Sequence, residues 1–491
     1  MKILLVNPPS EILRQEGSGI ITPLGLFYIG AVLEKAGHQV KIVDCVVQNW
    51  TNPKKFKRNG EIIHRFDVEK DFWPSLFSEF QPDLIGIANL FAASENICVE
   101  LAKKLKTLSG EVKIVIGGTN ASSRSKFLLR NDAVDFVVRG EGEYALRDLT
   151  QRLEKNLDFN NIAGLCYKQN GKLFVAPDYN WVENLDELPF PAYHLLNCSI
   201  ENYFNGQYPI FFVEKRILSF VTSRGCVRNC VFCSGMKNLG CWRSRSPENV
   251  LDELSRLKQT YGIKEISFMD PNIGLHKDRF VKLMNLMKEK KINLKWSPAG
   301  GLYLQTFTPD LVKLMRETGC HSVYLAIEHG DERMQKYIGK IVPLEKVKPI
   351  VREFKKYGIW VHGNFVVGLP GETEESLESC LDYAKKADLD SVVFFIGTPL
   401  PGSRLYEEVV KDENADIGDL RWTSKNIWWT EMEPDYLRAT VKRFMISFVK
   451  FRIISEFKPK NIFWRLKNFR FGNIKVYWKT MKRFLEYLIF R

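Results

Sequence analysis

Long hydrophobic runs are absent from this sequence. The first residues, MKILLVNPPS, contain a single Lys and only four consecutive apolar residues before Asn7, too few for the core of a signal peptide. No stretch approaches the roughly 20 apolar residues that span a bilayer. We therefore expect a cytoplasmic protein whose first apolar run is a buried strand.

Cysteine is sparse and mostly scattered. Ten cysteines in 491 residues do not resemble the dense disulfide framework of a small secreted domain. Most of them stand alone and are expected to be reduced thiols. Cys226, Cys230 and Cys233 are the exception, because they fall within eight residues of one another. These three are the first candidates for a functional site.

Acidic residues are nearly absent from the end of the chain. Residues 441–491 contain 14 Lys and Arg, two Glu and no Asp, so the formal net charge of +13 lies almost entirely there. The same segment contains 13 aromatic residues. This pattern is typical of an interfacial helix that binds anionic lipid, and would place the protein peripherally at the membrane. It fits equally well a helical cap with solvated cations, whereas nucleic-acid binding is the weakest alternative.

The remaining sequence predicts an α/β protein with several domains. Residues 1–150 alternate short apolar runs with helical patterns, which indicates a Rossmann-like parallel sheet. Residues 151–205 carry hairpin and turn signals and are expected to form a connector. Residues 206–412 contain six βα units, fewer than the eight of a closed barrel, and predict a partial (β/α)6 TIM barrel. Residues 413–491 are expected to form a helical C-terminal extension.

The three clustered cysteines have the spacing of an iron–sulfur site. Cys226-Val-Arg-Asn-Cys230-Val-Phe-Cys233 follows the first predicted barrel strand, at the end where barrel active sites are built. Three thiolates can hold three irons of a [4Fe-4S] cluster and leave the fourth iron open. A structural zinc would need a fourth ligand nearby, but Cys241 is eight residues away and no His lies in that window. Zinc, or three unconnected thiols, is therefore the weaker interpretation.

The CxxxCxxC spacing, with Phe232 before the third Cys, resembles the signature of the radical S-adenosylmethionine (SAM) superfamily. The resemblance implies that SAM binds the open iron and is cleaved reductively to a 5′-deoxyadenosyl radical, with an external donor of the flavodoxin or ferredoxin type. Further SAM contacts are implied at three strand ends: Asp270, Asn272, Glu328, Gly363, Gly368 and Gly371. His329 stands where the family usually has a small Ser. For Asp270 and Asn272, a strand-end turn and helix cap is an equally good interpretation.

The N-terminal half resembles the cobalamin-binding class of the same superfamily. The resemblance rests on Thr22-Pro23-Leu24-Gly25, on a Gly-Gly turn and on a Gly-Glu-Gly-Glu turn. The implied cobalamin contacts are Pro8, Ser94, Gly117, Gly118, Gly140, Glu141, Gly142 and Glu143. The Asp-x-His-x-x-Gly pattern that supplies a lower axial His is absent from the sequence. We therefore expect cobalamin to bind without that ligand, and a domain that has lost the cofactor is the alternative.

Together these resemblances imply a cobalamin-dependent radical SAM methyltransferase that acts on an unactivated carbon of a lipid-like or secondary-metabolite substrate. One alternative is a ring-forming or oxidative enzyme that resembles the porphyrin-ester cyclases of this class. Another is a non-enzymatic iron–sulfur sensor module. The sequence assigns no catalytic residue beyond the ligands of the cofactors.

Overall fold

The computed structural model describes residues 1–13, 20–58, 60–206, 212–412, 417 and 429–457. The chain divides into two compact units, which are described separately. The first comprises Met1–Pro209, Cys233–Arg243 and Leu400–Leu420, and the second comprises Ile210–Phe232, Ser244–Pro399 and Arg421–Arg491.

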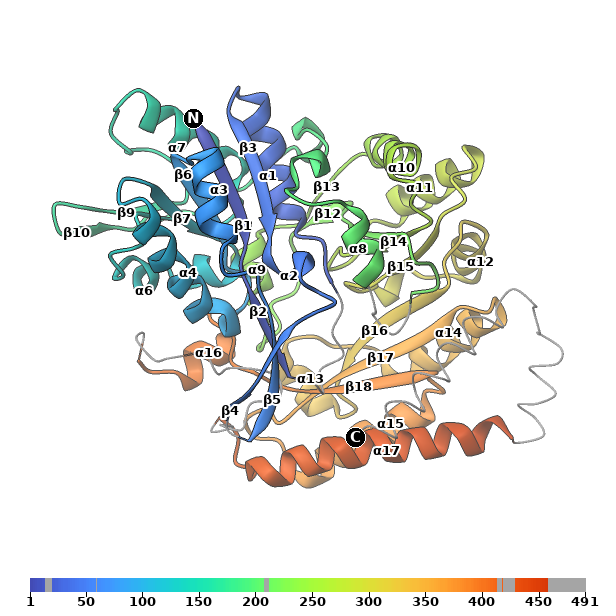
Figure 1. The fold of residues 1–491 in the computed structure, drawn as a ribbon. Helices are drawn as coiled ribbons and strands as arrows, with labels where there is room; N and C mark the ends of the chain where they lie inside the picture. The colour runs from blue at the N-terminus through green and yellow to red at the C-terminus, as the bar shows by residue number, and fades with distance from the viewer. Residues whose placement is uncertain (14–19, 59, 207–211, 413–416, 418–428, 458–491) are drawn as a thin grey trace. The chain divides into compact units, whose positions relative to one another are not determined.

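A seven-stranded sheet forms the centre of the first unit (Figure 1). Its strands are β1 (Lys2–Asn7), β3 (Gln39–Asp44), β6 (Leu84–Ala88), β7 (Lys113–Gly117), β8 (Phe136–Val138), β9 (Leu165–Gln169) and β10 (Lys172–Phe174). They lie in the order β10-β9-β8-β7-β6-β1-β3, and all neighbours from β8 to β3 pair in parallel. The predicted Rossmann-like sheet is therefore confirmed.

Helices cover both faces of this sheet, as its continuously apolar strands require. The main helices are α1 (Leu24–Lys35), α3 (Phe72–Phe80), α4 (Glu95–Leu108) and α7 (Gly142–Glu154). Leu4 and Val6 of β1 share a core with α3 and α4. Leu5 points to the opposite face, because side chains alternate along a strand, and lies near Gly30 of α1. Helices α1 and α7 pack against each other.

Two parts of the first unit differ from the sequence-based expectation. Strands β9 and β10 form an antiparallel hairpin, in keeping with the hairpin signals of the predicted connector, but this hairpin extends the main sheet, which was not expected. A separate antiparallel sheet, in the order β2-β5-β4, was not predicted; its strands are β2 (Ser10–Leu13), β4 (Lys54–Arg58) and β5 (Glu61–Phe66). Strand β4 reads Lys-Lys-Phe-Lys-Arg and is mostly exposed, so it lacks the apolar alternation on which strand prediction depends.

The second unit contains six parallel strands arranged as two three-stranded sheets. These are β11 (Ile217–Phe220), β14 (Glu265–Phe268) and β15 (Lys295–Pro298), and then β16 (Ser322–Glu328), β17 (Trp360–Val367) and β18 (Ser391–Ile396). A single bridge between Trp296 and Cys320 connects β15 to the start of β16. The six strands of the predicted partial barrel are all present.

Each of the first five barrel strands is followed by at least one helix. These helices are α10 (Pro247–Tyr261), α11 (Lys277–Glu289), α12 (Pro309–Glu317), α13 (Glu332–Ile338), α14 (Leu344–Lys356) and α15 (Glu374–Lys386). Helix α10 begins at a Ser246 cap with Pro247 in its first turn, and it ends at Gly262 in the left-handed conformation. All three end signals can be read from the sequence.

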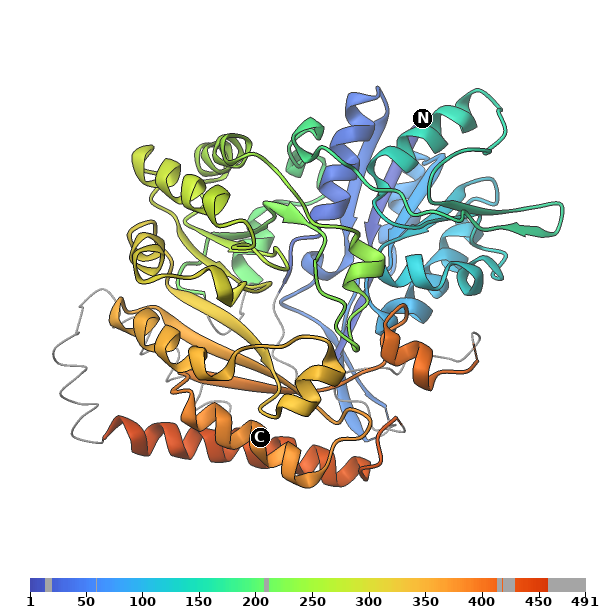
Figure 2. The same ribbon diagram turned by 180° about the vertical axis from the view of Figure 1, so that it is seen from behind.

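Helix α17 (Pro434–Glu456) is the described part of the predicted C-terminal extension. It packs on β18 and α15, and both views show it running beside them (Figure 2). Leu437, Phe444, Phe448 and Val449 are buried in this contact. In this helix the interpretation as a packed cap is therefore correct. The remainder of the basic aromatic tail, residues 458–491, lies outside the described residues.

Among the helices that the structure describes, none combines the length and hydropathy required of a membrane span.

Candidate functional site

Asp270 anchors the loop that leads to the clustered cysteines. Its side chain is buried at the end of β14 and accepts hydrogen bonds from Thr222 Oγ1 at 2.7 Å and Ser223 Oγ at 2.6 Å. The backbone N–H of Thr222 donates to the same carboxylate at 3.0 Å. Burial raises the pKa of Asp270, and these donors oppose that shift. Asp270, which was expected to contact SAM, therefore holds the backbone in place at Thr222, four residues before Cys226.

Each of two cysteine sulfurs in the motif accepts hydrogen bonds from nearby N–H groups. Cys226 Sγ accepts from the backbone N–H of Arg228 at 3.4 Å and from Asn272 Nδ2 at 3.3 Å. In the first unit, Cys233 Sγ accepts from the backbone N–H of Gly235 at 3.3 Å. N–H donors aimed at sulfur stabilise a thiolate, the form that binds iron. The donor set therefore fits an iron–sulfur cluster.

The cysteine loop packs on the end of α13. The backbone N–H of Val231 donates to Ile338 O at 2.8 Å, and a side chain at Gly339 would lie 3.1 Å from Asn229 O. The loop that follows α13 carries Lys340, whose Nζ lies 2.8 Å from Glu328 Oε1. Burial lowers the pKa of this Lys, but Glu328 and the Cys230 and Cys226 thiols outweigh burial and raise it. A cation is thus held beside two of the three cysteines.

Glu328 itself has an unusual backbone. Its φ is +70°, a left-handed conformation that is rare for residues other than Gly, Asn and Asp, and β16 is irregular at this point. The kink ends the strand and turns the carboxylate toward Lys340. Sequence reasoning singled out Glu328 but missed Lys340, because no spacing rule connects a strand end to a loop twelve residues later.

The chain's own packing explains two of the three glycines expected to contact SAM. A side chain at Gly363 would meet Leu389 at 2.5 Å, and one at Gly368, where φ is +75°, would meet Leu437 at 2.4 Å. Gly371 has a φ of +72° and open space around it. Backbone N–H groups of Gly368 and Leu369 donate to the buried carboxylate of Glu372, which fixes this turn. Of the three, only Gly371 leaves room for a ligand at its α-carbon.

The Gly-Glu-Gly-Glu turn of the first unit is also tightly held. A side chain at Gly140, with φ of +87°, would lie 2.3 Å from Asn180 O, and one at Gly142 would lie 2.8 Å from Ile29. Both oxygens of Glu141 accept from the guanidinium of Arg243, at 2.9 and 3.0 Å. Arg243 therefore ties this turn to the segment that begins at Cys233.

Other residues expected to contact cobalamin lie at the carboxyl ends of the parallel strands. Pro8 follows β1 and is buried, and Gly117 ends β7, where a β-carbon would have no neighbour closer than 4.0 Å. Gly118 has a φ of +114° and lies against Asn89 O, which excludes a side chain. Ser94 Oγ donates to Phe91 O at 2.8 Å. Glu143 is buried in the first turn of α7.

Two large apolar side chains at this edge of the sheet are exposed. Leu90 and Phe91, in the loop after β6, are 43% and 58% exposed. Nearby, the buried Asn120 Oδ1 has no hydrogen-bond partner. Ligands of open α/β sheets bind at the carboxyl ends of the strands, and a large ring with an apolar face would cover Leu90 and Phe91. This edge therefore fits a corrin.

Comparison with known proteins agrees with this geometry. The family model of the radical SAM superfamily matches residues 220–384, and that of the B12 binding domain matches residues 11–150. An uncharacterized methyltransferase of Pyrococcus horikoshii is 35% identical over 84% of this chain and 83% of its own length. The cytidylyl-2-hydroxyethylphosphonate methyltransferase of Streptomyces wedmorensis is 31% identical over 84% of this chain and 83% of its own length.

This chain belongs to the radical SAM superfamily. It is a radical SAM enzyme with an N-terminal B12 binding domain, and its cofactors are a [4Fe-4S] cluster, SAM and cobalamin. Its fold is similar to that of the radical SAM methyltransferase TsrM from Kitasatospora setae, with a TM-score of 0.65 and 18% identity over 84% of this chain and 78% of that one. The sequence-based expectations of family, fold class and cofactors are confirmed.

Proposed function

We propose that this enzyme transfers a methyl group to an unactivated carbon of a small organic substrate. The observation that carries the proposal is the presence of a B12 binding domain in the same chain as a three-cysteine motif that leaves one iron open. When bound, SAM and the cluster supply the radical that removes a hydrogen atom, and cobalamin supplies the methyl group. A flavodoxin or ferredoxin type protein supplies the electrons.

The chain's own residues would bind and orient these groups. Cys226, Cys230 and Cys233 would hold the cluster, and the N–H groups of Arg228 and Asn272 would stabilise the thiolate of Cys226. The ion pair of Glu328 and Lys340 places opposite charges at the end of β16, where a zwitterionic cofactor can be oriented. In the first unit, residues at the carboxyl ends of β1, β6, β7 and β8 would bind cobalamin, among them Pro8, Ser94, Gly117, Gly118 and Gly140–Glu143.

The test uses the full chain, reconstituted anaerobically with iron, sulfide and cobalamin. Cytidylyl-2-hydroxyethylphosphonate, the substrate class of one relative, is the first candidate, and SAM labelled in its methyl group is the donor. We expect label in the substrate together with 5′-deoxyadenosine. Formation of 5′-deoxyadenosine with an unmethylated, cyclised or oxidised product would favour the ring-forming alternative instead. No 5′-deoxyadenosine from enzyme with a full cluster would overturn the proposal.

A lipid-like substrate and a peripheral membrane contact form a second, finer proposal. Its support is the composition of residues 441–491 and the exposed Ile454 and Phe457, 64% and 74% exposed, at the end of α17. Because α17 itself packs on the barrel, the test truncates the chain after Phe457 and keeps that helix. The full chain should sediment with vesicles of anionic phospholipid and the truncated chain should not. Equal sedimentation of both would contradict a membrane role for the tail.

A further inference from the structure

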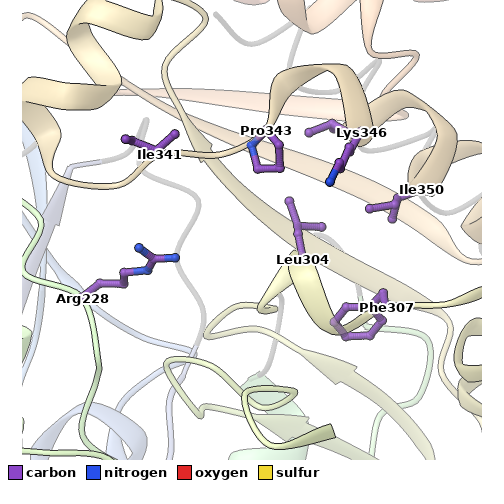
Figure 3. Close-up of a pocket in the computed structure, with 8 residues that line it drawn as sticks. Arg228, Leu304, Phe307, Ile341, Pro343, Lys346 and Ile350 are labelled. Atoms are coloured by element: carbon purple, nitrogen blue, oxygen red, sulfur yellow. The ribbon is translucent and has the colours of Figure 1, made fainter.

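The second unit contains a cavity of about 570 Å³ beside the cysteine motif. Its walls come from three places: the motif itself, the loop after β15, and the start of α14 with the loop before it. The lining residues are Arg228, Leu304, Phe307, Ile341, Pro343, Lys346, Val347 and Ile350. Figure 3 shows Arg228 and Ile341 on one side, and Lys346, Leu304 and Phe307 on the other.

Most of the wall is apolar, and one of its large apolar side chains is exposed to solvent. Ile341 is 60% exposed although it lines the cavity. Covering an aliphatic side chain in that position is favourable, because apolar surface is removed from water. The cavity therefore suits a ligand with an apolar portion.

The polar part of the wall is entirely cationic. Arg228 and Lys346 are its two charged residues, and none of the eight lining residues is acidic. Within the part of the chain that the structure describes, neither cation forms a salt bridge; Arg228 contacts only the hydroxyl of Tyr303, at 3.4 Å, and its ring. The amino end of α14, next to Pro343, adds a partial positive charge; Glu345 in the first turn of this helix is acidic but does not line the cavity. Two uncompensated cations at a cavity wall attract an anion.

We propose that this cavity binds the substrate, and that the substrate is an organic anion with an apolar portion, whose phosphoryl or phosphonyl group is attracted by the positive charges of Arg228 and Lys346 on opposite sides of the cavity. The proposal rests on the proposed methyl transfer and names the substrate class for it. Arg228 lies between two cysteines of the motif, so a substrate held by it lies close to the place where the radical forms. Specificity for the anion would thus be built into the motif loop itself.

Binding to the reconstituted full chain, measured by isothermal titration calorimetry without reductant, tests the proposal. Octyl phosphate and cytidine 5′-monophosphate represent a lipid-type and a nucleotide-type source of the same anionic group. Octanol and inorganic phosphate carry the apolar portion and the anion separately. We expect one of the two organic phosphates to bind at least tenfold more tightly than either octanol or inorganic phosphate, and the tighter one identifies the source.

Two charge reversals on one helix provide a matched control. Lys346→Glu places an anion in the cavity wall and should weaken binding of the preferred phosphate at least tenfold. Lys348→Glu makes the same change on α14 outside the cavity and should alter it less than twofold. Lys346→Met removes the charge without reversing it and should fall between them. Equal effects of the two reversals, or phosphates that bind no better than octanol, would overturn the proposal.

The binding experiment and the test of methyl transfer can fail separately. Formation of 5′-deoxyadenosine from SAM and reductant without substrate measures radical generation and should be unchanged in the control variant Lys348→Glu. If methyl transfer fails while phosphate binding follows the predicted pattern, the reaction is wrong and the site stands. If label reaches a substrate that Lys346→Glu binds normally, the site is wrong and the reaction stands.

Discussion

The Nε2 atom of His329 lies 2.7 Å from Oε1 of Glu372, and both side chains are completely buried. His329 follows Glu328 at the end of β16, whereas Glu372 holds the Gly-Leu-Pro-Gly turn after β17. The backbone N–H of Asp331 donates to His329 Nδ1 at 3.0 Å, so the proton of the neutral ring lies on Nε2 and points at Glu372. This contact fixes two segments expected to bind SAM relative to each other. It also explains why a larger residue stands where the family usually has Ser.

Cys380 completes a buried group with these two residues. Ligand atoms of His329, Glu372 and Cys380 lie within 4.8 Å of one another, which is close enough to hold a metal. Each of the three also has a hydrogen-bond partner in the chain, and Cys380 accepts from the backbone N–H of Gly330 at 3.3 Å. Burial keeps the pKa of this thiol well above its usual value, which opposes metal binding. We therefore assign the group a structural role.

His329→Ala should destabilise the protein strongly. Removing the ring takes one hydrogen-bond donor away from the buried carboxylate of Glu372, which costs about 1–3 kcal/mol, and it also leaves a cavity in the core. The free energy of unfolding in urea measures this loss, and the apparent affinity for SAM should fall with it. His194→Ala is the matched control, because His194 forms an exposed pair with Glu34 and should cost no more than about 1 kcal/mol. Equal stability of the two variants would contradict the structural role of His329.

Cys226→Ala should remove the cluster. The variant is expected to lose most of its iron and to form no 5′-deoxyadenosine, because one iron of the cluster would lack its thiolate. Cys241→Ala removes an exposed cysteine outside the motif, and it should retain both iron and activity. Iron content after anaerobic reconstitution and desalting is the measurement. A large loss of iron in Cys241→Ala would show that the motif is wider than three residues.

The sequence predicts elements better than it predicts contacts. The boundaries of β17, β18 and α10 follow from apolar periodicity and end signals, which are local. The partners of Asp270, Glu141 and Glu328 do not, because Thr222, Arg243 and Lys340 approach them from other parts of the fold. The reason for two glycines of the family motifs also became clear only from the structure. A side chain at Gly140 would collide with Asn180 and one at Gly363 with Leu389, so glycine is favoured at both positions even without a ligand.

Asn272→Leu should lower the reduction potential of the cluster. The bond from Asn272 Nδ2 to Cys226 Sγ stabilises negative charge on sulfur, and the reduced cluster carries more of it. If that bond is about 1 kcal/mol stronger in the reduced cluster than in the oxidised one, its loss shifts a one-electron potential by about 40 mV. A redox titration followed by electron paramagnetic resonance measures the shift.

Asn249→Leu provides the comparison for that titration, since Asn249 bonds to Arg245 at 2.7 Å and not to a cysteine. Its potential should match that of the unchanged protein. A shift in Asn249→Leu as large as that in Asn272→Leu would show that general loosening of the barrel, and not the bond to Cys226, sets the potential.

His362 should make stability depend on pH in the acid range. The ring is buried in β17 with Nδ1 2.7 Å from Ser391 Oγ, and burial lowers its pKa to about 3. Between that value and the ordinary pKa of about 6.5, the unfolded chain binds a proton that the folded chain does not. The contribution of His362 is therefore complete above pH 6.5 and is lost as pH falls, by up to about 1.4 kcal/mol per pH unit.

His362→Gln should flatten the dependence of the unfolding free energy on pH between 3.5 and 6.5, measured by urea denaturation. An unchanged slope in His362→Gln would contradict the prediction.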